Sequence, residues 1–162
     1  MSIRSLYLSG FALVALLLAF SIYLQVVDGI MPCPLCTLQR FTFGLLGLTF
    51  FLGIVIAKSK WGRHFTNALL VFWSSLGLFL AGRQIWLQQY GNAESNECGV
   101  SLQYMLQVLP FDQVMQRVFA GSAECTQRGW EFLHLNMAEW ASICFGFFLC
   151  MSLYLLFKAK KS

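Results

Sequence analysis

Two cysteines with two residues between them, Cys33 and Cys36, stand at the point where a long apolar run begins. Thiols at this spacing often have a lowered pKa, so that the thiolate serves as a nucleophile or a leaving group. Arg40 follows four residues after Cys36, which places both side chains on one face of a helix. Its guanidinium stays charged, and the start of a helix also favours an anion. The pattern predicts a redox-active dithiol in which Arg40 stabilises a thiolate at Cys36.

A second pair of cysteines has a different character. Cys98 and Cys125 are separated by 26 residues of largely polar chain. A purely structural disulfide between them would stabilise the fold by roughly 3–4 kcal/mol in the chain-entropy account. A zinc site built from both pairs would normally need a second close pair, which the sequence lacks, and we therefore expect no metal. Cys144 and Cys150 lie in an apolar run, where they are most simply small apolar side chains.

The composition is that of an integral membrane protein. Of the 162 residues, 58% are hydrophobic and 11% are charged, whereas a typical soluble domain has about 25% charged residues. Four runs with few or no charges are long enough to cross a hydrocarbon core of ~30 Å as helices. These runs are residues 6–27, 37–57, 65–87 and 140–157. Because lipid leaves no partner for an open sheet edge, we predict an all-α four-helix membrane bundle forming a single domain over residues 1–162.

The distribution of charge orients this bundle. Seven of the eleven basic residues lie near the chain ends or in the connector 58–64, close to span ends on one side. The positive-inside rule makes that side and both termini cytoplasmic, with loops 28–36 and 88–139 in the periplasm. The first run is longer than the apolar core of a signal peptide, and no cleavage site of small residues follows it, so we interpret it as a span. The net charge of +4 therefore reports topology and not nucleic-acid binding, and the four outer cysteines face an oxidising compartment.

The second outer loop contains a short amphipathic segment. Asp112 as its cap and Gly121 as its stop predict a helix that ends at Ala120. One face of this helix is apolar and consists of Val114, Met115, Val118 and Phe119. The pattern allows two positions for the helix, either on the membrane surface or against the top of the bundle.

These features together resemble the disulfide bond formation protein B (DsbB) family. The resemblance rests on the four spans, the Cys-x-x-Cys motif followed by an arginine, and the paired cysteines of the second outer loop. Further local matches are segments 109–112, 118–119 and 125–133, and the likeness covers nearly the whole chain. The resemblance implies an enzyme of the bacterial inner membrane that reoxidises a periplasmic DsbA-type dithiol protein and reduces a membrane quinone, either ubiquinone or menaquinone. Such a relay is known to keep the bacterial periplasm oxidising.

The resemblance also assigns roles to individual residues. Cys33 and Cys36 match the pair that passes electrons to quinone, Cys98 and Cys125 match the pair that meets the DsbA-type partner, and Arg40 matches the arginine at the quinone site. Some members of the family have a histidine near the outer end of the third span, where this chain has Trp86 to Gln89. Gln89 is therefore our candidate for a hydrogen bond to a quinone carbonyl.

Three alternatives remain open at this stage. Arg40 could extend to the lipid headgroups without a role at the thiolate. The partner could be a dedicated protein instead of a general DsbA. In a different functional class, the chain could be a membrane anchor or interaction protein whose outer disulfides are structural.

Overall fold

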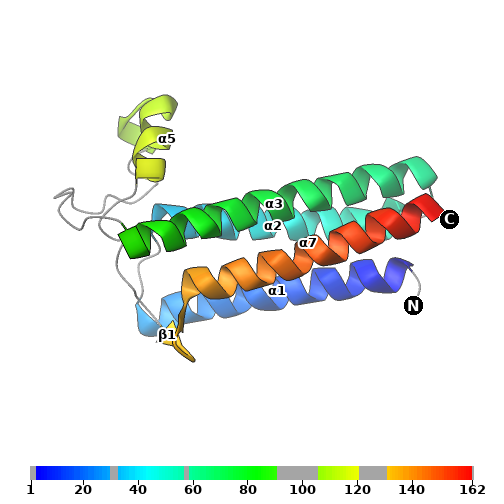
Figure 1. Cartoon of the computed structure of the whole chain (residues 1–162), viewed down its shortest axis with the longest axis horizontal. Helices are drawn as coiled ribbons and strands as arrows, with labels where there is room; N and C mark the ends of the chain where they lie inside the picture. Colours follow the sequence, from blue (N-terminus) through cyan, green and yellow to red (C-terminus); the bar gives the residue numbers. More distant parts are fainter. Residues whose placement is uncertain (1–2, 30–32, 57–58, 91–105, 121–130, 162) are drawn as a thin grey trace.

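Four long helices lie side by side and make up most of the molecule (Figure 1). The computed structural model describes residues 3–29, 33–56, 59–90, 106–120 and 131–161. The long helices are α1 (Ile3–Asp28), α2 (Pro34–Ile56), α3 (Lys60–Tyr90) and α7 (Met137–Lys161), and each contains a stretch long and apolar enough to cross a membrane. The prediction of an all-α, multi-pass membrane bundle is confirmed. Both chain ends lie at one end of this bundle, and the start of α2 lies at the other.

The helices pack in a defined order, with α1 on α2, α2 on α3, and α3 on α7. Aromatic rings fill the middle of the bundle, where Phe43 of α2 stacks on Phe145 of α7 with ring centroids 4.0 Å apart. A Cβ added at Gly77 of α3 would lie 2.1 Å from the Phe145 ring. Glycine at this position therefore lets α3 and α7 approach closely enough to bury that ring.

The long helices extend beyond the runs that hydropathy marks. Helix α2 begins at Pro34, before the predicted start at Thr37, because proline suits the first helical position and the Cys33 carbonyl accepts the Thr37 N–H at 3.0 Å. Helix α7 begins at Met137 with a reciprocal cap. The Glu139 N–H donates to Asn136 Oδ1 at 3.0 Å, and the Asn136 N–H donates to Glu139 Oε2 at 2.8 Å. Hydropathy locates the hydrocarbon region, whereas caps of this kind determine where a helix begins.

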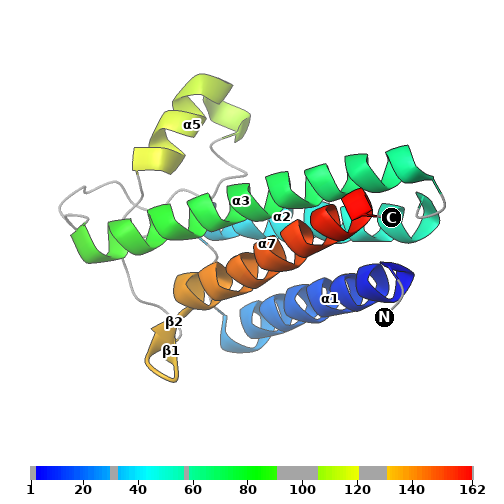
Figure 2. The same ribbon diagram turned by 45° about the vertical axis from the view of Figure 1, so that its right-hand side comes forward.

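Two small elements lie at the end of the bundle away from the chain termini, which is called the outer end below, on opposite sides of the bundle (Figure 2). Helix α5 (Phe111–Ala120) contacts α2 through Val114, which is 1% exposed. This contact favours the position against the bundle for the amphipathic helix. The helix begins at Phe111, and the Pro110 carbonyl accepts the Gln113 and Val114 N–H groups at 3.0 and 3.1 Å. Asp112 therefore lies inside the first turn, and its predicted role as the cap is wrong.

The second small element is a hairpin that the sequence did not indicate. Strand β1 (Glu131–Phe132) pairs antiparallel with β2 (Leu135–Asn136). Leu133 and His134 form its turn with φ angles of 55° and 64°. Such turns usually contain glycine or asparagine at these positions, and this chain has neither there. The hairpin leads directly into α7.

Candidate functional site

The start of α2 places Cys33 and Cys36 side by side. Cys33 occupies the cap position, and its Sγ accepts the Cys36 N–H at 3.3 Å, as a capping side chain does. The two sulfurs are 2.8 Å apart, with the Cys33 thiol donating to Cys36. Cys33 is 5% exposed beneath α5, whereas Cys36 is half-buried. The pair is therefore held in a geometry from which a disulfide can close with little movement.

An amide from α3 contacts both sulfurs. Gln84 Nε2 donates to Cys36 Sγ at 3.1 Å and, less closely, to Cys33 Sγ at 3.6 Å. Its Oε1 accepts from Gln39 Nε2 of α2 at 2.7 Å. Both glutamines are buried, at 3% and 5% exposed respectively. Sequence reasoning missed both as site residues, although polar side chains inside predicted spans were a signal that could have found them.

Arg40 faces a different neighbour from the one predicted. Its guanidinium donates to Gln25 Oε1 and, at 3.2 Å, to the Ser21 carbonyl, both on α1. Within the described part of the chain, these hydrogen bonds go to α1 and not to Cys36. The position in contact with the Cys36 sulfur is taken by Gln84. Arg40 therefore links the outer halves of α1 and α2.

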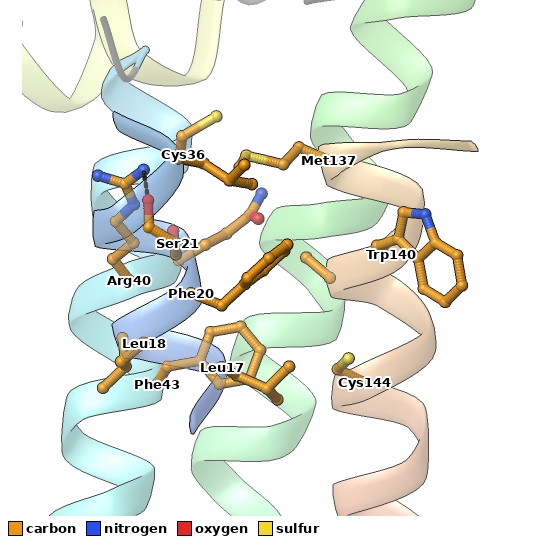
Figure 3. Close-up of a pocket in the computed structure, with 13 residues that line it drawn as sticks. Leu17, Leu18, Phe20, Ser21, Cys36, Arg40, Phe43, Met137, Trp140 and Cys144 are labelled. Carbon is orange, nitrogen blue, oxygen red and sulfur yellow. Dashed lines mark hydrogen bonds between the residues drawn. The ribbon is translucent and has the colours of Figure 1, made fainter. Parts of the chain in front are cut away.

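Cys36 and Arg40 nevertheless line one cavity of about 350 Å³ between α1, α2 and α7 (Figure 3). Its polar groups gather near the outer end, around Cys36, Arg40 and Ser21, and its deeper wall is apolar. The volume is within the range of sites that hold small organic ligands. The cavity is lined by Leu17, Leu18, Phe20, Ser21, Leu24, Cys36, Gln39, Arg40, Phe43, Met137, Trp140, Ala141 and Cys144.

The remaining predicted residues lie elsewhere. Gln89 is exposed near the end of α3 and does not belong to the set that lines the cavity. Its neighbour Gln88 accepts a hydrogen bond from the Asn136 amide at 2.7 Å, which ties the start of α7 to α3. Cys98 and Cys125 lie outside the described residues, and the expected absence of a metal site, which involves them, stays a prediction.

Comparison with known proteins gives a consistent result over nearly the whole chain. The profile of the family described as disulfide bond formation protein DsbB matches residues 3–155. Disulfide bond formation protein B of Azoarcus sp. (strain BH72) is 38% identical over 154 residues, which cover 95% of this chain and 92% of that protein. The protein of the same name from Marinobacter nauticus is 36% identical, covering 91% of this chain and 88% of its own. Disulfide bond formation protein B 1 of Pseudomonas aeruginosa is 35% identical, covering 93% and 92%.

Proposed function

The chain belongs to the DsbB family of disulfide bond formation proteins, and from that premise we propose that it reoxidises a periplasmic DsbA-type dithiol protein and passes the electrons to a membrane quinone. Membership supports a disulfide-forming oxidoreductase with several membrane spans. The observation that carries the rest is the position of Cys36. Cys36 belongs both to a close dithiol and to the residues that line an apolar cavity between membrane-spanning helices.

The residues around this cavity suit a quinone. Its walls are mostly aliphatic and aromatic, as a ring with an isoprenoid tail requires, and its outer end carries hydrogen-bond donors. Arg40 would hold a carbonyl oxygen at that end, and Phe43 and Trp140 would contact the apolar part. A bound quinone, either ubiquinone or menaquinone, supplies an acceptor for two electrons and two protons. The Arg40 guanidinium stabilises negative charge that develops on an acceptor oxygen in this low-dielectric setting.

The cysteines carry the electrons in successive thiol–disulfide exchanges. A thiolate of the partner attacks Cys98 of a Cys98–Cys125 disulfide, which forms a mixed disulfide and releases Cys125 as a thiolate. The partner's second thiol resolves this mixed disulfide, and the partner leaves oxidised. Cys125 attacks Cys33 of the Cys33–Cys36 disulfide and releases Cys36 as a thiolate beside the cavity. Attack of Cys98 on Cys125 restores the outer disulfide, and closure of Cys33–Cys36 with loss of two electrons and two protons restores the inner one.

Thiol trapping in quinone-depleted membranes tests this proposal. Relay cysteines accumulate in the reduced form when the acceptor is removed, and they reoxidise when quinone is added back. Structural disulfides of an anchor protein stay oxidised throughout. Persistent oxidation without quinone would therefore overturn the proposal.

Single substitutions test the order of the relay. We expect Cys33→Ala to abolish quinone-dependent oxidation of a reduced DsbA-type protein. Cys150→Ala serves as the matched control, because Cys150 is exposed on α7 and lies outside the cavity lining. Wild-type turnover in Cys33→Ala would show that the order of exchanges is wrong.

A further inference from the structure

Two sets of hydrogen-bond donors compete for the negative charge of the reduced cysteine pair. The backbone favours a thiolate on Cys33, because its Sγ accepts the Cys36 N–H at 3.3 Å at the start of α2. The side chains favour a thiolate on Cys36. Its Sγ accepts from the Gln84 amide at 3.1 Å, whereas the same amide nitrogen is 3.6 Å from Cys33 Sγ. A hydrogen bond to a charged acceptor is stronger than one to a neutral acceptor, so the shorter Gln84 contact weighs toward Cys36.

The choice between the two sulfurs has a functional consequence. Cys36 lines the cavity, whereas Cys33 packs beneath α5 with Val114 and Leu35. A thiolate on Cys36 therefore lies beside the space proposed for the electron acceptor, and a thiolate on Cys33 does not. When the reduced pair has lost one proton, the remaining proton is on Cys33 or on Cys36. Its position therefore decides whether the thiolate can donate electrons to the acceptor efficiently.

Gln84 can act as a donor to sulfur only in one orientation of its amide. Turning the amide over would direct Oε1 at the sulfurs, where an oxygen repels a thiolate. The Gln39 amide opposes this for Gln84 alone, because its Nε2 donates to Gln84 Oε1 at 2.7 Å. In the turned orientation two NH₂ groups would face each other in a buried site, and both would lose a partner. In a protonated Cys36, the thiol has only a longer contact of 3.6 Å to Gln84 Oε1.

We propose that Gln84 is a further catalytic residue, which directs the thiolate charge to Cys36, and that Gln39 is its positioning residue. The proposal rests on the proposed function, because the charge matters only if the pair is an electron donor. The cation that the sequence suggested for this role, Arg40, is directed toward α1. An uncharged amide pair from two neighbouring helices takes its place.

The partition of alkylation between the two cysteines tests this inference. The reduced full-length protein is placed in quinone-free lipid nanodiscs and treated briefly with limiting iodoacetamide, which reacts with thiolates. Mass spectrometry then gives the ratio of label on Cys36 to label on Cys33. We expect Gln84→Met to lower this ratio by roughly ten- to a hundredfold, the effect of removing one hydrogen bond to a charged group. Methionine keeps the length of the side chain and supplies no N–H donor.

The role of Gln39 is tested by non-additivity. Gln39→Met should lower the same ratio severalfold on its own, although its amide is bonded to Gln84 and not to sulfur. In the Gln84→Met background it should have no further effect, because it acts through Gln84. Gln88→Met, one turn further along α3, is the matched control and should leave the ratio unchanged. If Gln84→Met does not fold, Gln84→Asn is used, since the shorter side chain withdraws the amide from Sγ.

An unchanged ratio in the Gln84 variant, or an equal effect of Gln39→Met in both backgrounds, would overturn the inference. Failure of the proposed function would look different. In that case the wild type would not oxidise a DsbA-type protein with quinone, while the alkylation ratio, which needs no quinone, would still respond to Gln84.

Discussion

Replacing Arg40 by methionine separates two roles that the sequence alone assigns to the same charge. One role is to stabilise the Cys36 thiolate, and the other is to bind the electron acceptor. The hydrogen bonds of Arg40 that the structure describes go to Gln25 and to the Ser21 carbonyl on α1, which weighs against the first role. We therefore expect Arg40→Met to weaken the use of quinone and to leave the reactivity of the Cys36 thiol nearly unchanged.

The size of the effect follows from the contacts that are lost. A hydrogen bond to a charged group is worth about 1.5–3 kcal/mol. If Arg40 makes one such bond to the acceptor, kcat/KM for quinone should fall by roughly ten- to a hundredfold. The assay measures oxidation of a reduced DsbA-type protein at several concentrations of a short-chain quinone. Iodoacetamide alkylation of Cys36 in the reduced, quinone-free protein is measured in parallel.

Gln25→Leu provides the matched control for this experiment. It removes the side-chain partner of Arg40 on α1, leaves the Ser21 carbonyl and keeps the positive charge, so we expect a smaller loss of kcat/KM than in Arg40→Met. Tenfold slower alkylation of Cys36 in Arg40→Met, with unchanged use of quinone, would refute the reasoning. The cation would then act on the thiolate, as the spacing of Cys36 and Arg40 first suggests.

Two further predictions concern the bundle that holds the site. Gly77→Ala should lower the free energy of unfolding by about 1–3 kcal/mol, because the added Cβ would lie 2.1 Å from the Phe145 ring. Gly82→Ala on the same helix, where a Cβ meets nothing within 4 Å, should not destabilise the protein in thermal unfolding in detergent. Asn136→Ala should cost about 0.5–2 kcal/mol in the same assay through loss of the α7 cap. The substitution also removes the hydrogen bond from the Asn136 amide to Gln88. A melting temperature equal to that of the wild type would show that neither the cap nor this hydrogen bond stabilises the protein.

The sequence predicted the parts of this protein that depend on local composition. Four apolar runs predicted the four spans, because the cost of burying charge in lipid leaves a strong signal in the chain. The position of Cys33 and Cys36 at the start of the second helix followed from the prolines and the apolar run beside them. In each case the relevant residues are neighbours in sequence.

Features that depend on the packing of distant segments could not be predicted in the same way. Gln84 lies 48 residues from Cys36, and its contact with the sulfur exists only because α3 packs against α2. The direction of Arg40 likewise depends on the neighbouring α1, since the spacing to Cys36 on α2 allows a contact without requiring it. The turn at Leu133 and His134 lacks the usual residues for positive φ angles, so no local pattern marked it.

Contact of Cys36 with the Gln84 amide, and not with the Arg40 cation, is chemically reasonable. Cys36 must first be a leaving group in thiol–disulfide exchange and then act as an electron donor. A thiolate that is stabilised too strongly is a good leaving group but a poor nucleophile, because nucleophilicity falls as the pKa falls. Direct contact with Arg40 would push Cys36 toward that limit. The Gln84 amide stabilises the anion with a neutral donor at 3.1 Å, while the charge of Arg40 lies beside α1 at the edge of the same cavity. On the proposed function, the amide thus selects the sulfur that donates, and the cation acts on the acceptor where negative charge develops.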